Sequence, residues 1–284
     1  TDKLILQNAL LNHIREESDL MVEEILSNKE GMLWTKDQNQ NVYIVKTYFS
    51  GRECSIRDGE ECRRAVRLLA RLHKAMVMPE NSAWDVPVQR MDKEYDKHNR
   101  ELKKVRRFLR NKSQKTDFEI YLLRHYDSFM EKAFEIAEQW KNCRKPDTSE
   151  QPAGKRVFCH GDYQYHNLLL GENDMYVIKF KKFVCDSQVR DLYLFLRKLL
   201  EKNNWSASVG SGLLEAYQRE RPLAQEELCQ LYYRLAYPEK FWKIVNFYYN
   251  AGKAWIPGRN MEKFDKLLKQ EKDKEQFLRT ILPG

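Results

Sequence analysis

Residues 157–191 read VFCHGDYQYHNLLLGENDMYVIKFKKFVCDSQVRD, and this stretch decides the expected fold. It begins with an apolar run at 157–159, followed by a polar loop. Two further apolar runs, 168–170 and 175–178, are separated by a Gly-Glu-Asn-Asp turn. Short apolar runs bounded by Gly, Asn and Asp predict strands, and two such runs joined by a turn predict a β-hairpin. We therefore expect a strand, a polar loop and then a hairpin.

The polar loop carries His160-Gly161-Asp162, with Asn167 five residues after the aspartate. This is the spacing of the kinase catalytic loop H-R-D-x-x-x-x-N, with Gly in place of Arg. Phosphoryl transfer needs an Asp that orients the attacking hydroxyl, and an amide oxygen with a second carboxylate that hold Mg²⁺ against the phosphates. The pattern predicts Asp162 as the catalytic Asp and Asn167 as a metal ligand.

The second metal carboxylate should come just after the second hairpin strand, where this chain has Lys179. An ammonium group cannot ligate Mg²⁺. At a separation of about 4 Å and an effective dielectric constant of about 20, the two cations repel by about 8 kcal/mol before screening. We expect Lys179 to pair with Asp162 or to contact a phosphate, and we expect weak or absent binding of ATP and Mg²⁺.

The bulk composition is that of a globular protein with one large domain or two lobes: 284 residues, 42% of them hydrophobic. The net charge of +8 is spread through charged helices, which favours solvated helix faces over an anionic partner. No nucleic-acid motif accompanies the charge, and the sequence has neither a signal peptide nor an apolar stretch of membrane-spanning length. We therefore expect no nucleic-acid or membrane partner. Six cysteines without a C-x-x-C pair predict reduced, mostly buried thiols.

Hydrophobic periodicity predicts a small α+β lobe over residues 1–50 and a large helical lobe over 51–284, with the catalytic-loop hairpin at 157–183. The small lobe is expected to hold a helix at 3–16, a strand at 20–26 and a hairpin of 32–35 with 42–49. No further strand is expected between Gly51 and the large-lobe helices. These helices are predicted at 60–76, 85–111, 117–140, 191–202, 212–219, 225–235, 239–251 and 260–282.

Several strings together resemble the aminoglycoside phosphotransferase and choline kinase superfamily, and more closely its CotS-like spore coat protein family. They are HGDYQYHN (160–167), DSQVRDLY (186–193), LARLH (69–73), GREC (51–54) and YPEKFWK (237–243). The resemblance implies an α+β, protein-kinase-like fold of two lobes. In the family, a glycine-rich strand pair and a phosphate-anchoring lysine precede the small-lobe helix. They would lie upstream of Thr1, so we expect the small lobe to be incomplete here.

The resemblance also implies roles for residues of the loop. Asp162 and Asn167 correspond to the catalytic Asp and the metal-ligand Asn, and Asp191 to the structural Asp that braces the loop. His160 is expected to shape the loop through hydrogen bonds of its ring. Other spore coat proteins are the implied partners, and the implied location is the spore coat after synthesis in the cytoplasm.

Three functions stay open at this point. The first is a CotS-like coat protein with a degenerate phosphotransfer site and a structural or interaction role. The second is an active small-molecule or protein kinase that uses Asp162 as base. The third is an unrelated helical binding protein in which the loop is a coincidence, and it requires that no hairpin follow Asn167.

Overall fold

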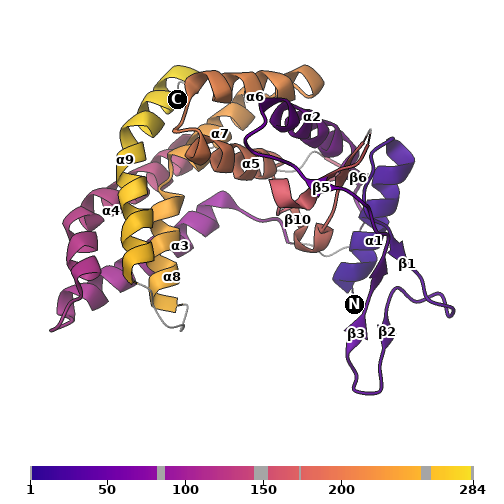
Figure 1. The fold of residues 1–284 in the computed structure, drawn as a ribbon, viewed down its shortest axis with the longest axis horizontal. Coiled ribbons are helices and arrows are strands. Elements are labelled where there is room, and N and C mark those ends of the chain that lie inside the picture. The colour runs from indigo at the N-terminus through magenta and orange to yellow at the C-terminus, as the bar shows by residue number, and fades with distance from the viewer. Residues whose placement is uncertain (1, 82–86, 144–152, 173, 251–256, 283–284) are drawn as a thin grey trace. The chain divides into compact units, whose positions relative to one another are not determined.

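The structure is a computed structural model that describes residues 2–81, 87–143, 153–172, 174–250 and 257–282. The chain divides into two compact units. The first unit holds Thr1–Gln89, Ser149–Leu199 and Ser208–Ala224, and the second holds Arg90–Thr148, Leu200–Ala207 and Gln225–Gly284. Among the described residues, the first unit mixes strands with helices and the second is helical (Figure 1), which confirms the predicted α+β class. These units follow the packing of the chain, and a lobe boundary at residue 50 stays a prediction.

The predicted strand, loop and hairpin are present in the first unit. Strand β7 (Lys155–Cys159) lies between β6 (Val77–Pro79) and β10 (Val184–Cys185) in an antiparallel sheet. The hairpin of β8 (Leu168–Leu170) and β9 (Met175–Val177) follows the polar loop. A hairpin after Asn167 contradicts the hypothesis that the loop motif is a coincidence in an unrelated helical protein.

Three strands of the first unit were not expected: β6 and β10, which flank β7, and a strand that joins the hairpin. Strand β5 (Arg52–Glu53) pairs antiparallel with β8 and so extends the hairpin into a three-stranded sheet. The approach is close at Gly51, where a Cβ atom would lie 2.5 Å from the carbonyl oxygen of Leu170. The prediction of no further strand is therefore wrong. A two-residue strand shows no alternation in the sequence, and it forms because the edge of β8 offers unpaired backbone groups.

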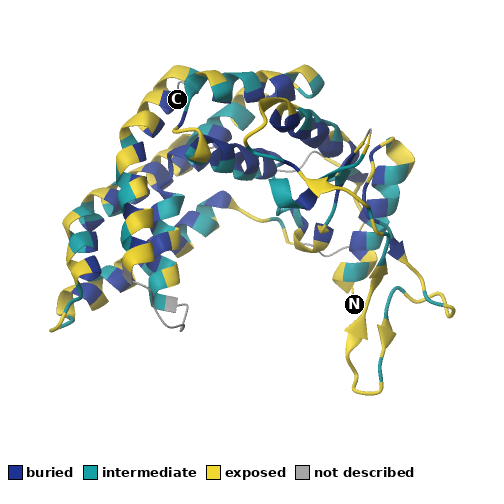
Figure 2. Cartoon of the chain, viewed as in Figure 1, coloured by how far each residue is buried: buried dark blue, intermediate teal, exposed yellow. Residues whose placement is uncertain are grey.

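The strands near the N-terminus are shorter than predicted. After helix α1 (Asp2–Glu17), β1 (Ile25–Leu26) pairs with β4 (Val45–Lys46), and β2 (Thr35–Lys36) pairs with β3 (Val42–Tyr43). The apolar run at 20–26 changes partner along its length, since Val22 forms an isolated bridge with Val177 of the catalytic-loop hairpin. The β2–β3 hairpin is exposed (Figure 2).

Helices α1 and α2 of the first unit pack against each other, and α2 (Gly59–Ala75) also packs against β6. Helix α2 begins where the Asp58 carboxylate accepts hydrogen bonds from the N–H groups of Glu60 and Glu61, at 2.9 and 3.1 Å, which is a normal N-cap. Helix α5 (Val189–Lys202) follows β10 directly, and α6 (Ala207–Glu220) follows α5. The first turn of α5 therefore lies next to the sheet that carries the loop.

In the part of the second unit that the structure describes, five helices form most of the chain: α3 (Met91–Asn111), α4 (Asp117–Cys143), α7 (Gln225–Ala236), α8 (Glu239–Asn250) and α9 (Pro257–Ile281). Helix α3 begins later than the predicted start at residue 85, which itself lies outside the described residues. Pro87 disfavours helix at the residue before it, and the N–H of Gln89 donates to the carbonyl oxygen of Cys185 at 2.8 Å. A search of the described helices finds none that is long and apolar enough to cross a membrane.

Candidate functional site

The loop between β7 and β8 rests on Asp191, in the first turn of α5. This carboxylate is fully buried and accepts hydrogen bonds from the backbone N–H groups of His160, at 2.6 Å, and Gly161, at 2.9 Å. The ring of His73, on α2, lies 3.5 Å from the same carboxylate. Burial acts to raise the pKa of Asp191, but the hydrogen bond from His73, the nearby histidine rings and the loop N–H groups outweigh it and hold the pKa below its ordinary value. The carboxylate is therefore ionised and satisfied.

His160 is buried and both nitrogens of its ring are used. Its Nε2 donates to the carbonyl oxygen of Ile178 at 3.0 Å, and its Nδ1 accepts from the N–H of Asp162 at 3.2 Å. Only the neutral ring can donate through one nitrogen and accept through the other. Burial lowers the pKa of His160, which favours the same form. The ring thus ties the loop to the end of β9.

Gly161 lets the loop turn against the segment that follows β9. Its φ of +76° lies in the left-handed region, and a Cβ atom there would lie 2.0 Å from the carbonyl oxygen of Lys182. The residue must be glycine for both reasons. The close approach of Gly161 to Lys182 also holds the backbone of Lys182 near Asp162, the residue that follows Gly161.

The Asp162 carboxylate is held by two side chains. Gln164 Nε2 donates to Oδ1 at 2.5 Å, and Lys182 Nζ donates to Oδ2 at 2.9 Å. Burial acts to raise the pKa of Asp162, but the hydrogen bonds from Lys182 and Gln164 outweigh it and hold the pKa below its ordinary value. A carboxylate in this state is ionised, yet each of its oxygens already has a donor.

Asn167 lies at the start of β8 and is almost fully buried. Its Nδ2 donates to the carbonyl oxygen of Asp162 at 2.8 Å, which draws the two ends of the loop together. Its Oδ1 is buried and accepts no hydrogen bond from any residue that the structure describes. A buried amide oxygen without a partner is suited to a hard cation, since Mg²⁺ prefers oxygen ligands.

Lys179 follows β9 in the left-handed conformation, with φ 68° and ψ 49°. A carboxylate from far upstream holds this backbone: Glu23 accepts from the N–H groups of Lys179, at 2.9 Å, and Phe180, at 3.0 Å. Glu23 also pairs with Lys46 Nζ at 2.6 Å. The Lys179 side chain is exposed and forms no ion pair with a described residue. The predicted pairing with Asp162 is made by Lys182 instead.

These residues do not fit the two-ligand Mg²⁺ site of the kinase pattern. The Oδ1 atom of Asn167 is available as an oxygen ligand. However, the carboxylate of Asp162 is paired with Lys182, and Lys179 stands at the sequence position where the second carboxylate is expected. Among the described residues there is no group of three or more His, Cys, Asp or Glu side chains that could hold a metal ion. The site thus keeps one of the two expected ligands, while a lysine stands at the sequence position of the other and a second lysine pairs with Asp162.

His73, on α2, supports the loop through its contact with Asp191. It is fully buried, and the hydroxyl of Tyr217 donates to its Nδ1 at 2.6 Å while Nε2 faces Asp191. Its carbonyl oxygen accepts from Gln188 Nε2 at 2.5 Å. Tyr217 lies 144 residues further along the chain than His73, so no spacing rule could have linked the two residues.

Three residues of the site were not predicted: Lys182, Gln164 and Glu23. Gln164 lies inside the loop motif, and its proximity to Asp162 in the sequence is a signal that could have identified it. Lys182 is one of two adjacent lysines, and nothing local distinguishes it from Lys181. Glu23 lies 156 residues before Lys179, so no spacing rule could have linked them.

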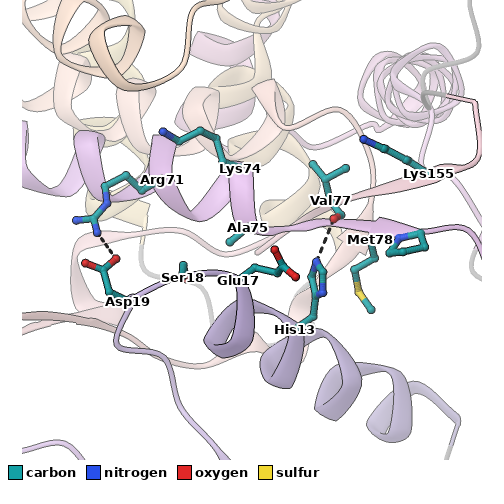
Figure 3. Close-up of a pocket in the computed structure, with 11 residues that line it drawn as sticks. His13, Glu17, Ser18, Asp19, Arg71, Lys74, Ala75, Val77, Met78 and Lys155 are labelled. Atoms are coloured by element: carbon teal, nitrogen blue, oxygen red, sulfur yellow. Dashed lines mark hydrogen bonds and ion pairs between the residues drawn. The ribbon is translucent and has the colours of Figure 1, made fainter.

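A separate cavity of about 480 Å³ lies elsewhere in the first unit (Figure 3). It is lined from α1, α2 and β6. His13 Nε2 donates to the carbonyl oxygen of Val77 at 3.1 Å, and Arg71 is paired to Asp19. None of Asp162, Asn167 and Lys179 lines it. The cavity is therefore distinct from the loop site.

Comparison with known proteins agrees with this fold. The profile of the family described as "Spore coat putative kinase YutH" matches residues 1–281. Spore coat protein S of Bacillus subtilis (strain 168) is 23% identical over 158 residues, which are 55% of this chain and 45% of that protein. The match therefore spans less than half of the length of this relative.

Solved structures show the same fold at low sequence identity. An aminoglycoside phosphotransferase from Alicyclobacillus acidocaldarius superposes with a TM-score of 0.82 at 17% identity, over 98% of this chain and 82% of that one. A spectinomycin phosphotransferase, solved in complex with ADP and spectinomycin, gives 0.62 at 11% identity, over 92% and 77%. Because the family profile covers nearly the whole sequence, the resemblance to spore coat proteins with a phosphotransferase fold is confirmed, and the chain belongs to the YutH family of spore coat kinase-like proteins.

Proposed function

We propose that this protein is a kinase-fold spore coat protein whose phosphotransfer site is degenerate and whose role is structural or interactive. One observation carries the proposal: the carboxylate expected to act as base, Asp162, is bound by Lys182, and Lys179 stands where a metal carboxylate is expected. The loop keeps its shape, but the charge around it is reversed from what a magnesium nucleotide needs.

The sum of the charges at the loop opposes the binding of a divalent cation. In the kinase pattern, two carboxylates and an amide face Mg²⁺ and the phosphates. Here a single carboxylate is paired with one lysine, and a second lysine has no carboxylate partner among the described residues. A divalent cation entering such a site meets a net positive neighbourhood, and each cation–cation contact opposes binding by several kcal/mol at short range, on the order of the Coulomb estimate.

Turnover by the protein and its Asp162→Ala variant tests this proposal. We expect no ATP hydrolysis or transfer above that of a buffer blank, and equal values for the two proteins. Turnover by the wild-type protein that disappears in Asp162→Ala would overturn it. Lys181→Ala is the control variant, because it removes a neighbouring charge that does not contact Asp162. Asp191→Asn is unsuitable as a control, because it changes the hydrogen bonds that shape the loop.

The alternative is an active small-molecule or protein phosphotransferase that uses Asp162 as base. The open Oδ1 of Asn167 favours it, since a buried acceptor without a partner suits a cation. This alternative expects Lys179→Asp to raise Mg²⁺-dependent ATP turnover. If neither the wild-type protein nor Lys179→Asp binds ATP, the alternative is wrong.

The partners and location belong to the same proposal: the protein acts in the spore coat, in contact with other coat proteins. Family membership supports this, and helix α3 offers a surface for such a contact. Basic residues recur along it at helical spacing, all exposed and without an ion-pair partner among the described residues: Lys93, Lys97, Arg100, Lys104 and Arg107. We call these five residues the α3 basic stripe.

The carboxylates of α3 do not neutralise this stripe. Asp96 pairs with Lys141, and Glu101 accepts a hydrogen bond from the ring N–H of Trp242. Asp92 and Glu94 are engaged with Arg90 and Arg234. Because every acid of the helix has another partner, the stripe presents five uncompensated positive charges, which complement an acidic protein segment.

Binding to poly-L-glutamate tests the stripe. We expect the Lys97→Gln/Lys104→Gln variant to lose about tenfold in affinity, and the loss to shrink at high salt because exposed charges are screened. Arg106 and Arg110 are paired with Asp127, so Arg106→Gln/Arg110→Gln is the matched control and should change binding much less. Equal losses in both variants, or a preference for DNA over poly-L-glutamate at equal charge, would contradict an acidic protein partner.

A further inference from the structure

The second unit brings two cysteines into contact. Cys143 is the last residue of α4, and Cys229 lies in the second turn of α7. Their sulfur atoms are 2.9 Å apart, although the residues are 86 positions apart in the sequence. From this geometry we propose that Cys143 and Cys229 are a site of oxidative modification, at which an intramolecular disulfide forms when a low-molecular-weight disulfide is present.

The distance places the two thiols close to bonding. A disulfide has an S–S length of about 2.05 Å, so the sulfur atoms need to approach by about 0.9 Å. The helices are already packed together beside the pair, since the rings of Trp140 on α4 and Tyr233 on α7 have centroids 5.8 Å apart. The bond therefore needs rotation of the cysteine side chains and no separation or realignment of α4 and α7.

The two thiols differ in exposure, which assigns them different steps. Cys143 is exposed, while Cys229 is half-buried and the remaining four cysteines are buried. Burial, followed by the contact with Cys143, raises the pKa of the Cys229 thiol to about 12. An external oxidant reaches Cys143 first, because thiol–disulfide exchange requires an accessible thiolate.

The reaction has two steps that balance. The Cys143 thiolate attacks a low-molecular-weight disulfide RSSR, which forms the mixed disulfide Cys143–S–S–R and releases one RSH. Cys229 then loses its proton, and its thiolate attacks the Cys143 sulfur and releases the second RSH. In total, two protein thiols are oxidised and one external disulfide is reduced to two thiols. Because the second step needs the Cys229 thiolate, its rate rises with pH.

The bond would fasten the end of α4 to α7 within one chain. Closing a loop of this length restricts the unfolded chain, so the oxidised protein should unfold at a temperature higher by about 5 to 10 °C. The proposed role in the coat does not enter this inference, which rests on the second unit alone. Its test therefore gives the same answer whether or not the loop site binds nucleotides.

The test incubates the full chain with oxidised glutathione at pH 8 and counts its thiols under denaturing conditions. The expected count falls from six to four in the wild-type protein. Trypsin cuts on both sides of Cys143, after Lys141 and Arg144, so the cross-linked peptide is small and is identified by mass before reduction and lost after it. The product should run as a monomer on a non-reducing gel.

The variants Cys143→Ser and Cys229→Ser decide the assignment. After oxidation, each variant should either keep its five thiols or carry one glutathione, and it should contain no internal cross-link. Its unfolding temperature should not rise on oxidation. Since Cys143 is exposed, Cys143→Ser should fold even if Cys229→Ser does not. The proposal is overturned if the wild-type protein keeps six thiols, if its count falls equally in Cys143→Ser, or if the oxidised product is a disulfide-linked dimer.

Discussion

The base of the loop and its open edge differ in how they use charge. At the base, Asp191 is buried and accepts from two backbone N–H groups of the loop, with His73 beside it. At the edge, the carboxylate of Asp162 is paired with the exposed Lys182, and the side chain of Lys179 has no ion-pair partner among the described residues. The base therefore fixes the conformation of the loop with buried contacts, while the edge carries the two lysines on which the proposed loss of metal binding rests.

This difference separates the residues that shape the loop from those that would use it. Buried hydrogen-bonded groups are costly to change one at a time, because each replacement leaves partners unsatisfied. Exposed charges change at little cost to stability. The loop can therefore keep its conformation while the charges at its edge change.

The largest effect is expected for Asp191→Ala. The change removes a buried acceptor and leaves the N–H groups of His160 and Gly161 without their partner, so we expect a loss of about 3 to 5 kcal/mol in the free energy of unfolding. Urea denaturation followed by circular dichroism measures it. A loss below about 1 kcal/mol would mean that Asp191 does not brace the loop.

The next effect is expected for Gly161→Ala. The methyl group would overlap the carbonyl oxygen of Lys182, and φ is +76°, so the loop must move away from that segment. We expect a loss of about 2 to 3 kcal/mol, in line with strained left-handed backbone and overpacking together. Gly212→Ala is the matched control, because a Cβ atom there meets nothing within 4 Å and φ is not positive. Equal losses in the two variants would contradict the account.

A smaller effect is expected from pH. Since burial lowers the pKa of His160, the folded state binds its proton less readily than the unfolded chain, and stability falls as the pH drops below about 6.5. Asp191 has a lowered pKa too, so its contribution is present at neutral pH and is lost in turn below about pH 4. Unfolding free energies from pH 7 to pH 5 should decline by at most about 1.4 kcal/mol per pH unit for the histidine, and His160→Gln should flatten the decline. An unchanged slope in that variant would contradict this assignment.

The smallest effect is expected for Asp162→Ala and Lys182→Ala. The side chain of Lys182 is 67% exposed, so the pair is screened by solvent and contributes no more than about 1 kcal/mol. The comparison with Asp191→Ala, on the helix α5 that supports the same loop, then measures the contrast between base and edge directly. Losses as large as that of Asp191→Ala would remove the contrast.

The sequence predicted what local pattern determines. Apolar runs and the Gly-Glu-Asn-Asp turn located the β8–β9 hairpin, and the spacing of Asp162 and Asn167 located the loop. It could not predict β5, whose two residues pair only because β8 has an open edge, or the start of α3 after Pro87.

The charges at the edge needed the structure as well. The sequence indicated that a lysine would pair with Asp162, but it pointed to Lys179, whereas the turn at Phe180–Lys182 and the contact with Gly161 bring Lys182 there. Glu23 holds the backbone of Lys179 from a segment with no sequence pattern in common. Contacts between distant segments depend on the folded backbone, and no local rule encodes them.

Thermal unfolding with ATP, in the presence and absence of Mg²⁺, tests the degenerate site most directly. We expect no Mg²⁺-dependent rise in unfolding temperature for the wild-type protein at millimolar ATP. The positive charges of Lys179 and Lys182 should oppose the binding of a divalent cation at Asn167. A rise of several degrees that requires Mg²⁺ and is lost in Asn167→Ala would contradict it.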